Sequence, residues 1–146
     1  MRKILLMLVM VLGLSTAMSA GDKYAHDASV LPQAARTTIA NNFKAGVSVV
    51  KIDKTLGHIN EYEVVLTDGT EISFDNKGNW ENVETSNSKS VPSGFIPDAV
   101  RKYVAKNQKG ARIVGIERER DGYEVELSNG IDMKFNQAGQ FLRYDD

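Results

Sequence analysis

The chain has 146 residues, no cysteine, a formal net charge of -1 and 42% hydrophobic residues. The absence of cysteine excludes disulfides, zinc-thiolate sites and thiol nucleophiles. Because acidic and basic residues nearly balance, the composition does not favour a nucleic-acid-binding protein, which usually carries a concentrated basic face. The hydrophobic core must therefore stabilise the fold without covalent cross-links.

The first twenty residues have the composition of a secretory signal. Arg2 and Lys3 precede an apolar run over residues 4–14, and small residues follow. The run is shorter than the roughly 20 residues of a membrane-spanning helix, and no lipobox cysteine is present. We therefore expect a periplasmic or secreted protein with no stable membrane span after signal cleavage, and a flexible N-terminus over residues 21–30.

Two helices are predicted, each beginning at a proline. In residues 32–43, Ala35, Ile39 and Phe43 follow one another at a spacing of four residues, which places them on one helical stripe. In residues 97–108, Val100 and Val104 repeat that spacing. Proline suits the first helical position because its missing N–H would lack a partner there in any case.

A β-branched run follows each helix, and the chain then repeats a phrase of twenty residues. Residues 47–52 and 113–116 read as strands. EYEVVLTDGTEISFDNKGNW, residues 61–80, then aligns without a gap on GYEVELSNGIDMKFNQAGQF, residues 122–141. The first copy has three more residues than the second around KTLGHIN, residues 54–60, which predicts a longer hairpin loop there.

The alternation of apolar residues fixes the turns within each phrase. A two-residue turn at Asp68-Gly69 would put the apolar residues of the two strands on opposite faces. A three-residue loop, residues 67–69, closed by a left-handed glycine, puts them on the same face. Loops at residues 76–78, 128–130 and 137–139 obey the same rule. The cross-strand pairs expected from these loops are Tyr62 with Phe74, Val64 with Ile72, Trp80 with Phe74, Tyr123 with Phe135, Val125 with Met133, and Phe141 with Phe135.

These elements predict an α+β fold made of a tandem repeat of one helix plus a four-stranded antiparallel meander sheet. We expect a signal peptide at residues 1–20, a first α-β4 repeat at 31–83, a linker at 84–95 and a second α-β4 repeat at 96–146. Units of about 50 residues are marginal alone, so the two repeats are expected to pack as one body.

The pattern resembles the PepSY-like family, the beta-lactamase-inhibitor-like exported bacterial proteins. The resemblance covers residues 31–146 and depends on the LP and IP helix starts, YEVVLTDGTEISFDNKGNW and YEVELSNGIDMKFNQAGQF. It implies a fold of tandem helix-plus-four-strand units and a broad role in binding proteins or peptides, since better known relatives inhibit beta-lactamases or peptidases. It implies no functional residues, because the family has no catalytic motif to match.

The residues offer no catalytic, metal or cofactor site. His26 and His58, the only histidines, are expected in the N-terminal tail and in a loop, and no G-x-S-x-G elbow is present. DNKGN, residues 75–79, faintly resembles a calcium loop, but it lacks the further ligands of an EF-hand and is explained by its turn. We therefore predict a protein that is not an enzyme and has no cofactor.

Acidic side chains are expected on the sheet face opposite the core. Their simplest interpretation is the solvated side of half-buried strands, and the alternative is a face that docks a basic partner. Our leading hypothesis is a non-enzymatic exported binding module that engages a protein or peptide of the cell envelope, for example as an inhibitor, through this face or the rim loops. We expect no nucleic-acid partner. The alternative is a small-ligand or metal carrier that uses the crevice between the repeats. The candidate partner-binding residues are Glu63, Glu71, Asp75, Glu124, Glu126 and Asp132.

Overall fold

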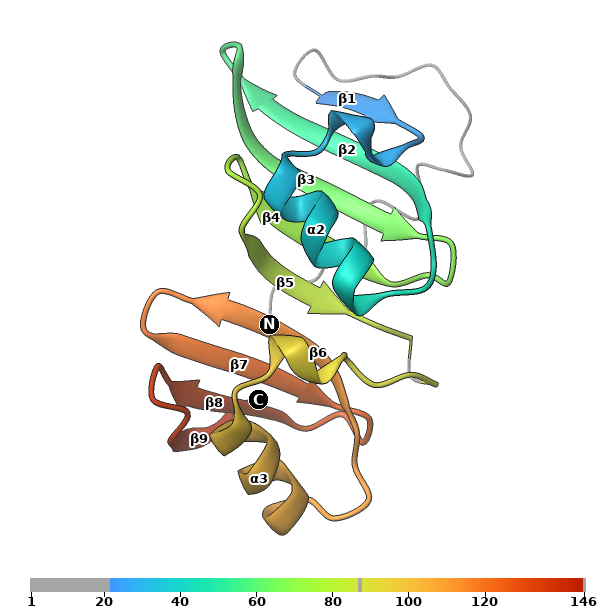
Figure 1. Ribbon diagram of the computed structural model, residues 1–146. Coiled ribbons are helices and arrows are strands. Elements are labelled where there is room, and N and C mark those ends of the chain that lie inside the picture. Colours follow the sequence, from blue (N-terminus) through green and yellow to red (C-terminus); the bar gives the residue numbers. More distant parts are fainter. Residues whose placement is uncertain (1–21, 87, 146) are drawn as a thin grey trace. The chain divides into compact units, whose positions relative to one another are not determined.

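The computed structural model describes residues 22–86 and 88–145 (Figure 1). The signal peptide expected at residues 1–20 lies outside the described residues. The described chain is α+β, with mostly antiparallel strands and two α-helices. It divides into two compact units, residues 22–81 and residues 82–145, and the division falls inside one strand, β5.

In the first unit, one strand precedes the α-helix along the sequence and the other strands follow it. Each of β1, β2 and β3 pairs with the next strand in antiparallel fashion. The elements are β1 (Asp22–Ala25), the 3-10 helix η1 (Ala28–Val30), α2 (Gln33–Asn42), β2 (Val47–Thr55), β3 (His58–Leu66), β4 (Glu71–Asp75) and the start of β5 (Trp80–Glu84).

The register of β3 and β4 is the one predicted from alternation. Tyr62 pairs with Phe74 and Val64 pairs with Ile72. All four side chains are buried, as are Ala35 and Ile39 on α2. One sheet face and one stripe of the helix therefore form the core of this unit, because each buries its apolar side chains against the other.

The hairpin between β2 and β3 differs from the expected long loop. The two strands run on to Thr55 and His58, and the turn holds only Leu56 and Gly57, both with positive φ. Nine residues separate the paired Ile52 and Tyr62, but only four separate the equivalent pair Arg118 and Tyr123, so the first hairpin is five residues longer. One of the five is taken up by a bulge where the pairing shifts between Asp53 and Lys54, and the other four lengthen the strands by two pairs. The prediction of a longer loop was therefore wrong, because paired backbone groups are satisfied in a ladder and a loop would leave them to water.

Residues 21–30 are not simply a flexible terminus. Residues 22–25 form β1, which pairs with β2, and residues 28–30 form a 3-10 turn. Tyr24 packs beside the buried Val49 and Val65. The sequence analysis missed this strand because its apolar anchor is a single side chain, and its contact partners are far away along the chain.

The second unit has the same order of helix and strands. β6, β7 and β8 each pair with the next strand, and β5 pairs with β6 through Asn82–Glu84. Its elements are the rest of β5, the 3-10 helix η2 (Ser93–Phe95), α3 (Asp98–Asn107), β6 (Ile113–Glu119), β7 (Gly122–Leu127), β8 (Asp132–Asn136) and β9 (Phe141–Asp145).

An aromatic cluster joins α3 to the sheet of the second unit. The ring of Tyr103 stacks on Phe141 at 4.7 Å between centroids and meets the edge of Phe135 at 5.7 Å. Phe141 pairs with Phe135, as predicted, and so do Tyr123 with Phe135 and Val125 with Met133. In the first unit, Trp80 is half-buried, and its predicted position opposite Phe74 stays a prediction.

The segment expected as a polar linker is held to the second unit. Backbone N–H groups of Thr85 and Val91 donate to the carbonyls of Val114 and Ile113, at 2.8 Å each. Val91 and Phe95 are 4% exposed. These two apolar side chains give the segment more capacity for burial than its many serines suggested.

A turn glycine lies against the start of each helix. Gly78 and Gly139 have φ of 90° and 81°, so the left-handed loops predicted there are confirmed, as are those at Gly69 and Gly130. A Cβ on Gly78 would lie 2.9 Å from the backbone nitrogen of Ala35. A Cβ on Gly139 would lie 2.8 Å from the Cβ of Ala99. Both positions therefore need glycine for backbone conformation and for space.

This double requirement predicts a difference between two glycines of the second unit. Gly139→Ala should lower the free energy of unfolding by about 2–4 kcal/mol, because it combines an unfavourable φ with a clash at α3. Gly130→Ala is the matched control, since Gly130 has φ 86° and nothing within 4 Å of an added Cβ. It should cost only about 1 kcal/mol. Urea denaturation measures both, and equal losses would contradict the proposed contact.

Candidate binding face

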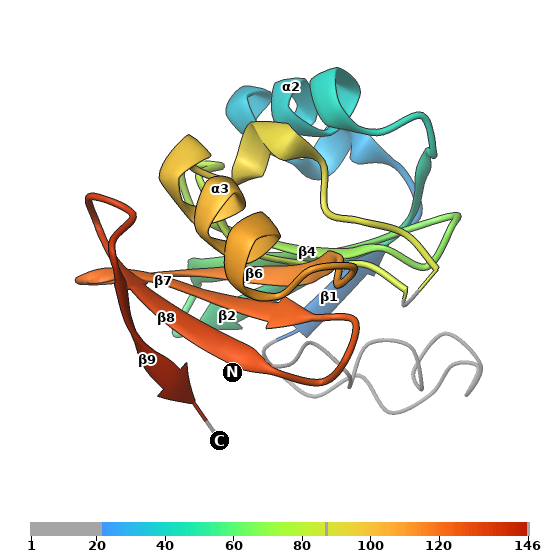
Figure 2. The ribbon, with the colours of Figure 1, turned by 90° about the horizontal axis from the view of Figure 1, so that it is seen from below.

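Each unit leaves one face of its sheet without a helix. Viewed from below, α2 lies on one side of the strands of its own unit, and α3 likewise lies on one side of its strands (Figure 2). We call the opposite side of each sheet its outer face. Because neighbouring side chains in an antiparallel register share a face, the strand pairings identify which residues lie there.

The outer face of the first unit carries carboxylates beside the apolar cluster of Tyr24, Val49 and Val65. One cross-strand row contains Lys51, Glu63 and Ser73, and Lys51 contacts Glu63 at 3.8 Å between Nζ and Oε2. Asp75 is engaged by its own turn, where Oδ1 accepts from the backbone N–H groups of Lys77 and Asn79. These hydrogen bonds lower the pKa of Asp75 despite an opposing effect of burial. The carboxylates of this face are Asp53, Glu61, Glu63, Glu71 and Asp75.

The outer face of the second unit, which we call the acidic face, carries more carboxylates. A row across five strands contains Asn82, Glu117, Glu124, Lys134 and Arg143. A second row joins Glu84, Gly115, Glu126, Asp132 and Asp145. Lys134 contacts Glu119 at 3.5 Å and Asp145 at 3.9 Å. The acidic face thus holds seven carboxylates and two cations: Glu84, Glu117, Glu119, Glu124, Glu126, Asp132 and Asp145, with Lys134 and Arg143.

The six candidate residues lie on these outer faces, but the sequence analysis omitted several of their neighbours. Glu61, Glu117 and Glu119 share the alternation of the residues that were chosen, so the period of two could have found them. Asn82 and Asp145 gave no such signal. Their place depends on the bulge in β9 and on the pairing of β5 with β6, neither of which local sequence encodes.

The expectation of a fully solvated face was wrong for several carboxylates. Glu61 and Glu71 are 7% exposed, and Glu124 is 3% exposed. Burial raises the pKa of Glu124 to about 7, and a hydrogen bond to the Asp145 side chain adds to the shift while Lys134 opposes it. That hydrogen bond lowers the pKa of Asp145. Near neutral pH the two carboxyl groups therefore share one proton, held mainly on Glu124.

Two neutral polar side chains are buried on the outer faces without hydrogen-bond partners among the described residues. Asn82 is 1% exposed, and neither its Oδ1 nor its Nδ2 has a partner. Ser73 is also 1% exposed and its Oγ has none. Leaving such a group unsatisfied costs about 1–3 kcal/mol, so neither side chain is explained by stability.

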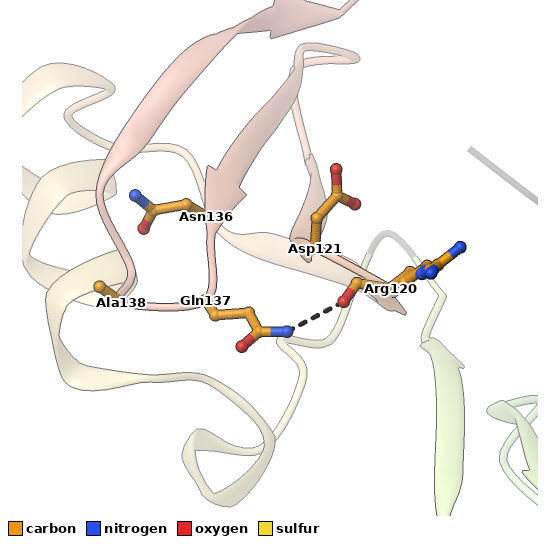
Figure 3. A pocket seen from close by; sticks show the side chains of 5 residues that line it. All are labelled: Arg120, Asp121, Asn136, Gln137 and Ala138. Atoms are coloured by element: carbon orange, nitrogen blue, oxygen red, sulfur yellow. Dashed lines mark hydrogen bonds between the residues drawn. The ribbon is translucent and has the colours of Figure 1, made fainter.

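A shallow hollow of about 690 Å³ lies at the rim of the second unit, between the β6–β7 and β8–β9 turns. It is lined by Arg120, Asp121, Asn136, Gln137 and Ala138 (Figure 3). Gln137 Nε2 donates to the carbonyl of Arg120 at 2.9 Å, while the Arg120 and Asn136 side chains point in different directions. The lining groups do not converge on one point, so the hollow offers no preformed ligand site.

The described residues contain no arrangement typical of a metal centre or a histidine relay. Within residues 22–86 and 88–145, no group of three or more histidine or acidic side chains could hold a metal ion. Both histidines are exposed: His26 lies within 3.3 Å of the Ser48 carbonyl, and His58 begins β3. In the same part of the chain, neither helix has the length and apolar composition required to cross a membrane.

Comparison with known proteins identifies the family. The family model described as "putative beta-lactamase-inhibitor-like, PepSY-like" matches residues 60–143. The chain belongs to the PepSY-like family. Among curated proteins, none matches it.

Three solved structures resemble the chain over most of its length. A periplasmic protein of unknown function from Bacteroides vulgatus is 44% identical, with TM-score 0.80, over 86% of this chain and all (100%) of its own. A protein of Bacteroides thetaiotaomicron, described as a "putative calcium-regulated periplasmic protein", is 36% identical, with TM-score 0.77, over 86% of this chain and 97% of its own. A second periplasmic protein of B. vulgatus is 35% identical, with TM-score 0.77, over 88% and 100%. These descriptions support a periplasmic location.

The shared proton predicts a pH-dependent stability. Between pH 4.5 and about 7, an unfolded chain ionises Glu124 while the folded chain keeps it neutral, so the stability of the wild-type protein should fall as pH rises. Glu124→Gln should remove about 1 kcal/mol of this decrease, since solvent screens part of the interaction. Urea denaturation from pH 5 to pH 8 measures the slope, with Glu126→Gln as the matched control that retains it. An unchanged slope in Glu124→Gln would contradict the assignment.

Proposed function

We propose that this PepSY-like protein is a non-enzymatic binding module of the cell envelope that engages a protein or peptide. The observation that carries the proposal is the acidic outer face of each sheet, which no described helix covers. A surface of this kind attracts a basic partner at long range and orients it before contact. The residues proposed to contact the partner are Glu63, Glu71, Asp75, Glu124, Glu126 and Asp132.

The proposal includes a tandem origin for the two units. The two units have the same order of elements, with α2 followed by β2 to β5 and α3 followed by β6 to β9. The start of each helix lies against a turn glycine. A duplicated unit presents two versions of the same outer face. The versions can then diverge in charge and in polar groups while both keep the same core.

The absence of enzyme activity is part of this proposal. Paired carboxylates can act as acid and base where a cleft separates their pKa values. Glu124 and Asp145 have separated pKa values, yet they lie on a sheet face. Hydrolysis also requires side chains that position a substrate. The groups that line the hollow, among them Gln137 and Arg120, do not converge on one point.

Capture from an envelope extract tests the binding function. Immobilised protein should retain a specific partner at low salt after crosslinking, identified by mass spectrometry. A variant in which the six proposed carboxylates become amides should lose that partner. The matched control replaces three exposed lysines at α3 by glutamine and should retain it: Lys102, Lys106 and Lys109. Repeated capture of nothing, or retention by the amide variant, would refute the proposal.

A metal carrier is the second candidate, because one relative is described as calcium-regulated. A ligand that binds only the folded state at about 100 times its dissociation constant adds about 2.7 kcal/mol of stability. Since no metal-holding group is found among the described residues, we expect the thermal midpoint in millimolar calcium to equal that in magnesium. A midpoint raised by calcium alone, and abolished by Asp75→Asn or Asp132→Asn, would favour the carrier.

A further inference from the structure

The acidic face of the second unit has a repeat distance that suits an extended chain. Side chains on one face of a strand recur every second residue, about 6.6–6.8 Å apart. Glu117 and Glu119 on β6, and Glu124 and Glu126 on β7, are spaced in this way. An extended peptide that lies along these strands presents alternate side chains at the same spacing, so Lys or Arg at every second position would meet a carboxylate each time.

Asn82 supplies the second observation. Asn82 lies in the same cross-strand row as Glu117, and only 1% of the residue is exposed. Both Oδ1 and Nδ2 of its amide lack a partner among the described residues. A primary amide offers an acceptor and two donors, and a peptide group offers one donor and one acceptor. A backbone segment that reached Asn82 could therefore satisfy both atoms at once.

A glycine lies beside Asn82 on the outer face, although its own backbone is buried. Gly115 lies in the neighbouring row between Glu84 and Glu126, and it places no side chain on the outer face. A partner backbone can approach a strand most closely at such a position. The polar amide, a glycine without a side chain and the periodic carboxylates are thus found together on β5, β6 and β7.

We propose that the acidic face of the second unit binds an extended peptide segment with Lys or Arg at alternate positions, and that Asn82 hydrogen-bonds the backbone of this segment. The inference rests on the proposed function and names the chemistry of its partner. Even with a proton on Glu124, six carboxylates against two cations favour a cationic occupant. The paired amide atoms of Asn82 favour a polypeptide over a simple polyamine, which has no carbonyl to accept from Nδ2.

The first unit provides an internal comparison. Its outer face also carries carboxylates, but Lys51 contacts Glu63, the Asp75 carboxylate accepts hydrogen bonds from its own turn, and the buried polar group is the hydroxyl of Ser73. A hydroxyl donates and accepts through a single oxygen, whereas the separate oxygen and nitrogen of an amide can form two hydrogen bonds side by side. Comparing the two outer faces therefore distinguishes the effect of acidic charge in general from the effect of the arrangement around Asn82.

The test measures binding of a fluorescent twelve-residue peptide with alternating Lys and Ser to the mature protein by anisotropy. Glu117→Gln/Glu126→Gln should weaken binding at least about tenfold, which corresponds to about 1.4 kcal/mol. Asp53→Asn/Glu61→Gln, a matched pair on the outer face of the first unit, should change it less than about twofold. An isomeric peptide with its lysines in one block should bind several-fold more weakly than the alternating peptide.

Asn82→Ala tests the anchor separately from the charge. It should weaken binding about fivefold to tenfold with an unchanged salt dependence, because a hydrogen bond is lost and no charge is removed. It should also raise the thermal midpoint, since an unsatisfied buried amide is removed. Asn82→Ser, which keeps one polar atom, provides a second variant if Asn82→Ala folds poorly, and should bind with intermediate affinity.

The inference is overturned if both double variants lose binding equally, if the block peptide binds as well as the alternating one, or if Asn82→Ala binds like the wild type. Absence of any binding of the alternating peptide also overturns it. The proposed function fails on a different result, namely repeated capture of no partner from the envelope extract. Capture of a partner without cationic segments would sustain the proposed function and refute this inference.

Discussion

The close approach of each helix to a turn glycine is the constraint on which the rest of the structure depends. The turn of Gly78 lies against the backbone nitrogen of Ala35, and the turn of Gly139 lies against the Cβ of Ala99, so neither turn has space for a side chain. This contact fixes where α2 and α3 begin over their sheets. Tyr103 can then stack on Phe141 in the second unit, and the apolar side of the sheet is closed to water.

Once one side of a sheet is closed by its helix, the other side is available for charge. The first and second units both use it for carboxylates in register across neighbouring strands. Like charges at this distance repel one another, and their burial raises the cost. The structure reduces that cost with Lys51, with Lys134 and with the proton on Glu124. It does not eliminate the cost, because Ser73 and Asn82 remain buried without partners in the described part of the chain. Proteins retain such local violations mainly where function needs them.

Much of the fold could be predicted from the sequence because two rules are local. The alternation of apolar residues and the left-handed glycine loops determine the pairs Tyr62 with Phe74 and Tyr123 with Phe135. Features that depend on distant contacts could not be predicted in this way. β1 exists because Tyr24 meets Val49 and Val65, which lie more than twenty residues away.

The candidate site was less predictable than the fold. Alternation places carboxylates on a face, but it says nothing about how deeply each is buried. Glu124 looks like any other exposed strand glutamate in the sequence, and only its surroundings in the folded chain raise its pKa. Asn82 is equally inconspicuous, since its importance comes from pairing with Glu117 across a segment of more than thirty residues.

The bulge in the β2–β3 hairpin shows how this architecture accommodates changes in chain length. Five additional residues, an odd number, would turn every later side chain of β3 to the opposite side of the sheet if a turn of the same length closed the hairpin, and this would bring Glu63 into the core and expel Tyr62. The pairing shift between Asp53 and Lys54 removes one residue from the count and restores parity. An insertion of an odd number of residues in these sheets therefore needs a compensating bulge nearby, whereas an insertion of an even number only lengthens the paired strands.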